Sequence, residues 1–128
     1  VKLDKLLQKS DIITLHLRLN ESTRGFIDRD KLSKMKSGAY LINCARGDVV
    51  VEDDLYKALD SGIISGAAMD VFWKEPLPAD SRWKNLKNVV LTPHIGGQTS
   101  EALKNACYRV ARDLVKFFKG EVINSRVV

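Results

Sequence analysis

The apolar positions of the chain alternate between two patterns, one typical of helices and one typical of strands. Segments with an apolar residue every three or four positions, which is the spacing of an amphipathic helix, cover residues 3–9, 30–35, 52–61 and 99–119. Short apolar runs typical of strands cover residues 12–17, 39–43, 63–69 and 89–91. Strands that alternate with helices predict an α/β fold with a partial, doubly wound parallel sheet of the Rossmann-like type.

The ends of these elements have recognisable signals. Ser10-Asp11 interrupts the first helix, Ser61-Gly62 ends the third, and Gly120 stops the last. The run at 12–17 is nearly continuous, as expected of a strand that is covered on both faces. Residues 72–88 form a loop with two prolines and one helical turn near Trp83. The last helix has an apolar face formed by Leu103, Ala106, Cys107, Val110, Leu114, Phe117 and Phe118.

Composition adds few constraints. The chain has 128 residues, of which 45% are hydrophobic and 29% charged, values typical of one globular domain. The net charge of +5 is spread along the chain without a block of like charge, so no nucleic-acid partner is expected. The apolar runs are too short to span a bilayer, and no membrane partner is expected. Cys44 and Cys107 stand in apolar settings without metal-ligand spacing, which predicts reduced thiols, a cytoplasmic location and no metal site.

A polar residue follows each predicted strand. His16, Asn43, Asp70 and His94 occupy these positions, and Arg46 comes shortly after Asn43. Ligands of parallel α/β sheets bind outside the carboxyl ends of the strands, so these side chains predict a ligand site at one sheet edge. Each residue also has a structural explanation: Asp70 could cap a turn, Asn43 could brace a loop, and the histidines could be hydrogen-bonded structural residues. Four strands that follow one rule favour the ligand site.

Three of the residues form a candidate catalytic set. The guanidinium of Arg46 can bind a carboxylate through two parallel hydrogen bonds. His94 can give or take a proton near neutral pH, and Glu75, in the loop that leaves the third strand, could fix the tautomer of its imidazole. This set suits the reversible reduction of a 2-keto acid. Spacing alone leaves open that Glu75 is a solvated loop acid and that Arg46 is a surface ion-pair partner.

Four ordered motifs carry a family resemblance. Ser-Asp-Ile-Ile-Thr-Leu-His (10–16), Asn-Cys-Ala-Arg-Gly (43–47), Gly-Ala-Ala-Met-Asp-Val-Phe (66–72) followed by Glu75-Pro76, and Thr-Pro-His-Ile-Gly-Gly (92–97) resemble the D-isomer-specific 2-hydroxyacid dehydrogenases. That family includes phosphoglycerate dehydrogenases, glycerate/hydroxypyruvate reductases and D-lactate dehydrogenases. The resemblance extends over essentially the whole chain.

The resemblance implies specific roles. Arg46 would bind the substrate carboxylate, Glu75 would pair with the histidine, and His94 would be the catalytic acid/base. The cofactor would be NAD, with NADP not excluded, and the other ligand a small 2-hydroxy or 2-keto acid. The family also implies a homodimer. The implied cofactor contacts are His16, Leu17, Cys44, Ala45, Arg46, Asp70, His94, Gly96 and Gly97.

The chain departs from the family pattern in several places. Arg18 stands where the family usually has proline, and Val51 stands where an aspartate often caps the second helix, which moves the expected helix start to Glu52 or Asp53. No Gly-x-Gly-x-x-Gly turn and no following ribose-binding acid are present. Residues 1–128 are therefore expected to be the second half of a dinucleotide-binding domain, with residues 120–128 starting the crossing to a substrate domain.

An incomplete domain has predictable properties. The isolated chain is expected to bind NAD(H) weakly and to turn over no substrate. Its exposed sheet is expected to self-associate or to bind a partner chain that supplies the rest of the domain. Two other functions share the fold: a corepressor-like module that senses NAD, and formate dehydrogenase. Formate dehydrogenases typically have glutamine in place of Glu75, since formate oxidation needs no proton-transfer carboxylate, so Glu75 favours hydroxyacid chemistry.

Overall fold

The computed structural model describes residues 1–123, which fall into two compact units divided after His94. Of the expected crossing segment at 120–128, residues 124–128 lie outside the described part of the chain.

The first unit contains four strands and three α-helices, with two short 3-10 turns. Its elements are α1 (Leu3–Lys9), β1 (Ile12–Leu15), α2 (Arg29–Ser33), β2 (Tyr40–Asn43), η1 (Gly47–Val49), α3 (Glu52–Asp60), β3 (Gly66–Met69), η2 (Arg82–Asn85) and β4 (Val89–Leu91). The second unit contains α4 (Ser100–Phe118). The predicted alternation of helix and strand is confirmed.

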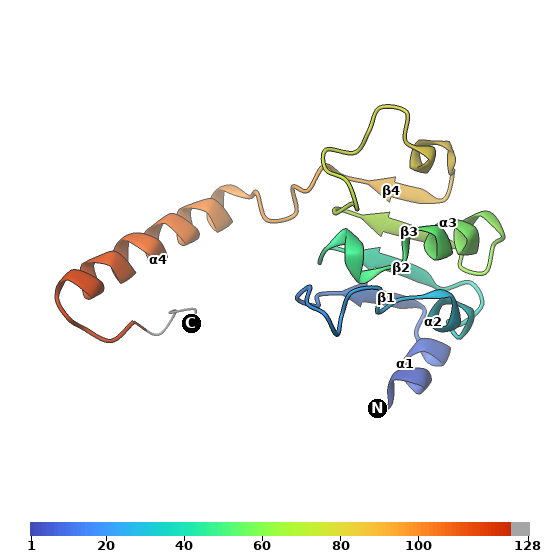
Figure 1. The fold of residues 1–128 in the computed structure, drawn as a ribbon, viewed down its shortest axis with the longest axis horizontal. Coiled ribbons are helices and arrows are strands. Elements are labelled where there is room, and N and C mark those ends of the chain that lie inside the picture. Colours follow the sequence, from blue (N-terminus) through green and yellow to red (C-terminus); the bar gives the residue numbers. More distant parts are fainter. Residues whose placement is uncertain (124–128) are drawn as a thin grey trace. The chain divides into compact units, whose positions relative to one another are not determined.

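The four strands form one parallel sheet in sequence order, β1-β2-β3-β4 (Figure 1). Every connection therefore moves along the sheet in the same direction. Crossovers between parallel strands are almost always right-handed, so connections that all move one way lie on the same face of the sheet. In a doubly wound sheet, helices reach the second face only where the strand order reverses direction. The strand order here does not reverse, so the chain forms half of such a sheet, as predicted.

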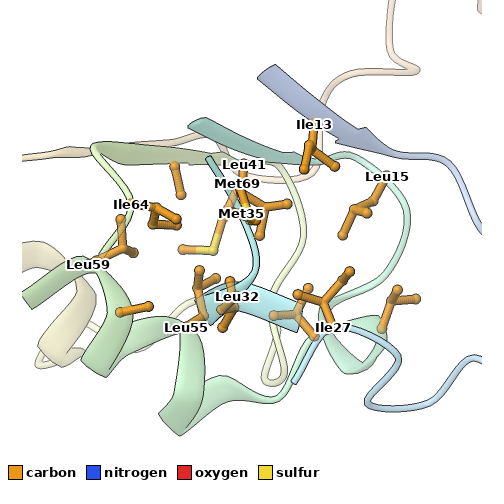
Figure 2. Close-up of a cluster of buried hydrophobic side chains, with 14 of the residues drawn as sticks. Ile13, Leu15, Ile27, Leu32, Met35, Leu41, Leu55, Leu59, Ile64 and Met69 are labelled. Atoms are coloured by element: carbon orange, nitrogen blue, oxygen red, sulfur yellow. The ribbon is translucent and has the colours of Figure 1, made fainter. Parts of the chain in front are cut away.

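The core lies between the sheet and the helices on this covered face. Figure 2 shows side chains of the strands, among them Ile13, Leu41 and Met69, directed toward those of Leu32 on α2 and Leu55 on α3. Trp83, from η2, is also buried in this core. The helices therefore bury the apolar side chains of one face of the sheet.

The expectation that residues 12–17 form a strand covered on both faces is wrong. The strand ends at Leu15, and its residues alternate between exposed and buried, with 59% of Ile12 exposed. Tyr40 and Val90 on other strands are similarly exposed. The connections lie on a single face, which explains this pattern, because no helix of residues 1–94 then covers the opposite face of the sheet.

The prediction that both cysteines stand in apolar settings is also wrong. Cys44 and Cys107 are exposed free thiols. Cys44 lies just beyond the end of β2, in the loop that continues to Arg46. Cys107 lies on α4, where no residue is buried. Both cysteines have apolar neighbours in the sequence, but the structure leaves their side chains exposed.

Smaller differences have local causes. The second helix begins at Arg29 because the side chain of Asp28 caps it, accepting a hydrogen bond from the amide of Lys31 at 3.0 Å. Residues 63–65 bend rather than join β3. The 3-10 turn η1 was not predicted, whereas the turn near Trp83 was. The start of α3 at Glu52 agrees with the absence of a side-chain cap at Val51.

The second unit is the predicted long helix. Thr99 caps α4 by accepting a hydrogen bond from the amide of Ala102 at 3.1 Å, and Gly120 follows its end with a left-handed φ of 70°. The predicted apolar face is present, but its residues are exposed, as at Phe117 and Phe118. In the part of the chain that the structure describes, none of the helices combines the length and the apolar character needed to cross a bilayer.

Replacement of Leu55 by alanine tests the core. Leu55 is completely buried, so Leu55→Ala is expected to lower the free energy of unfolding by about 2–5 kcal/mol through lost burial and a residual cavity. Leu6→Ala in α1 is the matched control, because 38% of Leu6 is exposed, and we expect it to cost about 1 kcal/mol or less. Urea unfolding measures both. Equal losses would contradict the assigned core.

Candidate functional site

The register of the sheet aligns the carboxyl ends of its strands. Leu15 pairs with Asn43, Asn43 with Met69, and Met69 with Leu91. The predicted residues His16 and Asp70 follow these paired positions directly, and Arg46 and His94 lie three residues past the ends of β2 and β4. The prediction that the strands deliver polar residues to one sheet edge is confirmed.

The buried side chain of Asn43 builds the turn that carries Arg46. Its Nδ2 group donates to the carbonyl oxygen of Arg46 at 3.0 Å, and its Oδ1 atom accepts from the amide of Ala45 at 3.0 Å. Asn43 therefore does brace a loop, the structural alternative considered above. The guanidinium of Arg46 is exposed and makes one local hydrogen bond, from Nη1 to the carbonyl oxygen of Ala45 at 2.7 Å. A fixed turn thus presents an exposed cation at the sheet edge.

Glu75 and His94 form a hydrogen-bonded pair. The Nδ1 atom of His94 lies 2.8 Å from Oε2 of Glu75. The second carboxylate oxygen accepts a hydrogen bond from the amide of Phe72 at 2.9 Å. Glu75 is therefore not a merely solvated loop acid. Because a carboxylate can only accept, Nδ1–H of His94 donates to Glu75, and this bond fixes the tautomer and orientation of the imidazole.

The surroundings of Glu75 favour its ionised form. The hydrogen bond from His94 lowers the pKa of this carboxyl group most, and the Phe72 amide lowers it further. Partial burial opposes these effects, and the charges of His94 and Arg46 add smaller attraction. The charge of Arg46 is the smallest of these contributions.

His94 occupies an unusual backbone conformation. Its φ of 55° lies in the left-handed region, which residues other than glycine seldom adopt and which is enriched at functional sites. The amide of His94 donates to the carbonyl oxygen of Thr92 at 3.0 Å. The hydroxyl of Thr92 donates to Oδ1 of the buried Asp70 at 2.6 Å. Asp70 therefore joins the ends of β3 and β4 just before the histidine.

Two cavities lie at this part of the first unit. One of about 600 Å³ is lined by residues that include Glu75, His94 and Lys84. The other, of about 430 Å³, is lined by His16, Leu17, Arg18, Leu19, Cys44, Ala45 and Arg46. The predicted residues are thus brought to two neighbouring groups: the acid and histidine line the first cavity, and the arginine lines the second with four of the expected cofactor contacts.

Other expected contacts are not placed with these groups. Asp70 lines neither cavity. Gly96 and Gly97 belong to the second unit, and their cofactor contacts stay a prediction. Sequence reasoning missed the Phe72 amide and the Thr92 hydroxyl, since a backbone donor has no sequence signal and a threonine before proline is unremarkable. In residues 1–123, no group of three or more His, Cys, Asp or Glu side chains is arranged to hold a metal ion.

Comparison with known proteins identifies the chain's relatives. Residues 1–96 match the family model described as "D-isomer specific 2-hydroxyacid dehydrogenase, NAD binding domain". The chain belongs to this dehydrogenase family. The match includes the turn of Arg46 and the Glu75–His94 pair, and the structure has the Rossmann-like parallel sheet of such domains.

Individual 2-hydroxyacid dehydrogenases agree with this membership. A glyoxylate reductase of Thermofilum pendens is 48% identical over 94% of this chain, which spans 35% of that protein. The structure of D-lactate dehydrogenase with NAD⁺ from Lactobacillus jensenii has a TM-score of 0.89 and 32% identity, covering the whole of this chain and 42% of that one. A family member from Xanthobacter autotrophicus, in complex with NADPH and MES, has a TM-score of 0.87 and 35% identity, covering 98% of this chain and 51% of that one.

The pKa of Glu75 leads to a pH-dependent prediction. Because the pKa is lower in the folded chain, the stabilising contribution of the ionised carboxylate is present above the ordinary value of 4.5 and is lost as the pH falls through the folded value. Glu75→Gln should therefore reduce stability at pH 7 and reduce it less as the pH is lowered below 4.5. The side chains of His94 and Glu75 are 43% and 37% exposed. The loss of unfolding free energy should therefore stay under about 1 kcal/mol.

Urea unfolding across this pH range measures the difference. Glu21→Gln is the control, because Glu21 lies in an exposed loop and has no cation partner among residues 1–123. A Glu75→Gln effect that is constant with pH would contradict the assigned hydrogen bond.

Proposed function

We propose that this chain is the second half of the NAD-binding domain of an enzyme that transfers hydride between NAD(H) and a small D-2-hydroxy or 2-keto acid. The observation that carries the proposal is the 2.8 Å hydrogen bond between Glu75 and His94, at the sheet edge where the turn after β2 presents Arg46. An acid/base, its carboxylate partner and an anion-binding cation are the groups that the reaction requires.

Each residue has a distinct role in the proposal. Arg46 binds the substrate carboxylate with its guanidinium fork and polarises the adjacent keto group. His94, protonated at Nε2, donates its proton to the keto oxygen when the substrate is reduced, and recovers it when the hydroxy acid is oxidised. Glu75 holds Nδ1–H and keeps the ring oriented. The nicotinamide supplies or accepts the hydride.

The cavity that includes Arg46 suits part of such a cofactor. His16, Arg18 and Arg46 place nitrogen-bearing groups in its lining, which contains no Asp or Glu. An anionic dinucleotide therefore meets favourable charge there. We propose that His16, Leu17, Cys44 and Ala45 contact the cofactor, together with Asp70, Gly96 and Gly97. NAD is the expected cofactor, although three similar structures hold NADPH or NADP.

The two alternative functions have less support. Glu75 bonds to His94 and to a backbone amide at once, an arrangement suited to a proton-transfer histidine. Formate oxidation releases only hydride and does not need a proton-transfer histidine. A corepressor that senses NAD could keep the same residues, and a hydride-transfer assay against a peptide-binding assay on the full-length protein distinguishes it.

The proposal extends to assembly and location. The uncovered sheet face, with Ile12, Tyr40 and Val90 exposed, supports association with another protein surface. A homodimer in the cytoplasm is the arrangement that we propose. The substrate that we propose is a small 2-keto acid.

Replacement of His94 tests the acid/base role. In the full-length enzyme, His94→Gln is expected to lower kcat on the order of a hundredfold or more, because the amide cannot transfer a proton. His16→Gln is the comparison: we expect it to raise the KM for NADH more than it lowers kcat. Steady-state reduction of glyoxylate and hydroxypyruvate with NADH measures both. A nearly normal kcat for His94→Gln would refute the role.

The isolated 128-residue chain tests the proposed domain assignment. We expect it to bind NADH weakly by fluorescence titration, to reduce no 2-keto acid, and to sediment as an associated species because of its uncovered sheet face. Robust turnover by this chain, or a monomer over the whole concentration range, would contradict the corresponding part of the proposal.

A further inference from the structure

Gly47 lies where two site-forming segments touch. A Cβ atom added to this buried glycine would lie 2.3 Å from the carbonyl carbon of Phe72, 2.5 Å from its oxygen and 2.6 Å from the amide nitrogen of Trp73. All three are backbone atoms, so no side-chain rotation can relieve the overlap. The φ of Gly47 is not in the left-handed region. Glycine is therefore required here for close approach and not for an unusual conformation.

Each of the touching segments carries part of the candidate site. Gly47 follows Arg46 directly, and the amide of Phe72 donates to Glu75, which bonds to His94. A second link joins the same segments, since the indole nitrogen of Trp73 donates to the carbonyl oxygen of Val50 at 2.8 Å. The separation of arginine from acid and histidine thus depends on a contact between two backbones.

The loop at residues 72–88 is also anchored to α3. The rings of Trp73 and Trp83 stack with centroids 5.3 Å apart, and Trp83 donates to Oε1 of Glu52 at 3.0 Å. The loop therefore cannot move away from Gly47 without breaking packing against α3. On the opposite side, Asn43 fixes the Arg46 carbonyl. Both segments that meet at Gly47 are therefore held in place.

We infer that Gly47 is a positioning residue, which sets the distance between Arg46 and the Glu75–His94 pair. This inference rests on the proposed function. An alanine would have to move the segments apart by about 1 Å to reach ordinary contact, and displacements of this size can lower turnover on the order of a hundredfold. The substrate carboxylate held by Arg46 would then be displaced from the proton on His94.

Gly47→Ala in the full-length enzyme tests the inference. We expect kcat/KM for the 2-keto acid to fall on the order of a hundredfold, while the KM for NADH changes less than threefold. Gly66→Ala is the matched control, because its Cβ would meet the carbonyl oxygen of Asn88 at 2.7 Å, at the opposite end of β3. It should lower the thermal midpoint comparably and leave kcat/KM within about threefold, since its overlap lies away from the site.

A double-mutant cycle separates positioning from general damage. If Gly47 acts by placing Arg46, Gly47→Ala should cost only a few-fold when Arg46 has already been replaced by alanine, because coupled residues are non-additive. An equal fold-loss in both backgrounds, or no loss in the wild-type background, would overturn the inference. A wild-type enzyme inactive on every 2-keto acid would instead refute the proposed function.

A second variant covers the case in which Gly47→Ala does not fold. Trp73→Phe keeps an aromatic ring against Trp83 but removes the hydrogen bond to Val50. We expect a smaller loss of kcat/KM in the same direction, again reduced in the Arg46→Ala background. Additive behaviour of Trp73→Phe would count against the inference.

Discussion

Right-handed crossovers between parallel strands place their connecting segments on a single face for as long as the chain moves along the sheet in one direction. The four strands of this chain are added in sequence order, so the interior forms on one side, and all four carboxyl ends meet at one edge. The first consequence explains why Leu55 and Trp83 are buried while Ile12 and Val90 are exposed. The second brings Arg46, Asp70 and His94 to one part of the molecule.

The candidate site depends on buried polar side chains that shape its backbone. Asn43 and Asp70 are the two buried polar residues of the first unit's core, and both lie at strand ends. Asn43 shapes the turn before Gly47, and Asp70 accepts the hydroxyl of Thr92 two residues before His94. A buried polar group is costly unless it is hydrogen-bonded. These bonds therefore restrict the backbone from which Arg46 and His94 extend.

The sequence predicted the fold class well because helix and strand positions depend on local patterns. Helical spacing and short apolar runs located the α-helices and strands of residues 1–123, and a polar residue after each predicted strand indicated the sheet edge. Three features depended on tertiary arrangement and were missed or wrong. The exposure of Ile12 follows from which face the connections take, and the exposure of Cys44 follows from a loop that lies at the surface. The contact of Gly47 with Phe72 joins segments distant in sequence.

The stacked tryptophans give the chain a built-in optical label. Trp73 and Trp83 are its only tryptophans, their rings are nearly parallel at 14°, and both belong to the segment that contains Glu75. Two indoles this close couple electronically, so the tryptophan emission and the indole contribution to the circular dichroism of this chain report on one loop. Opening of that loop would be visible spectroscopically without any attached dye.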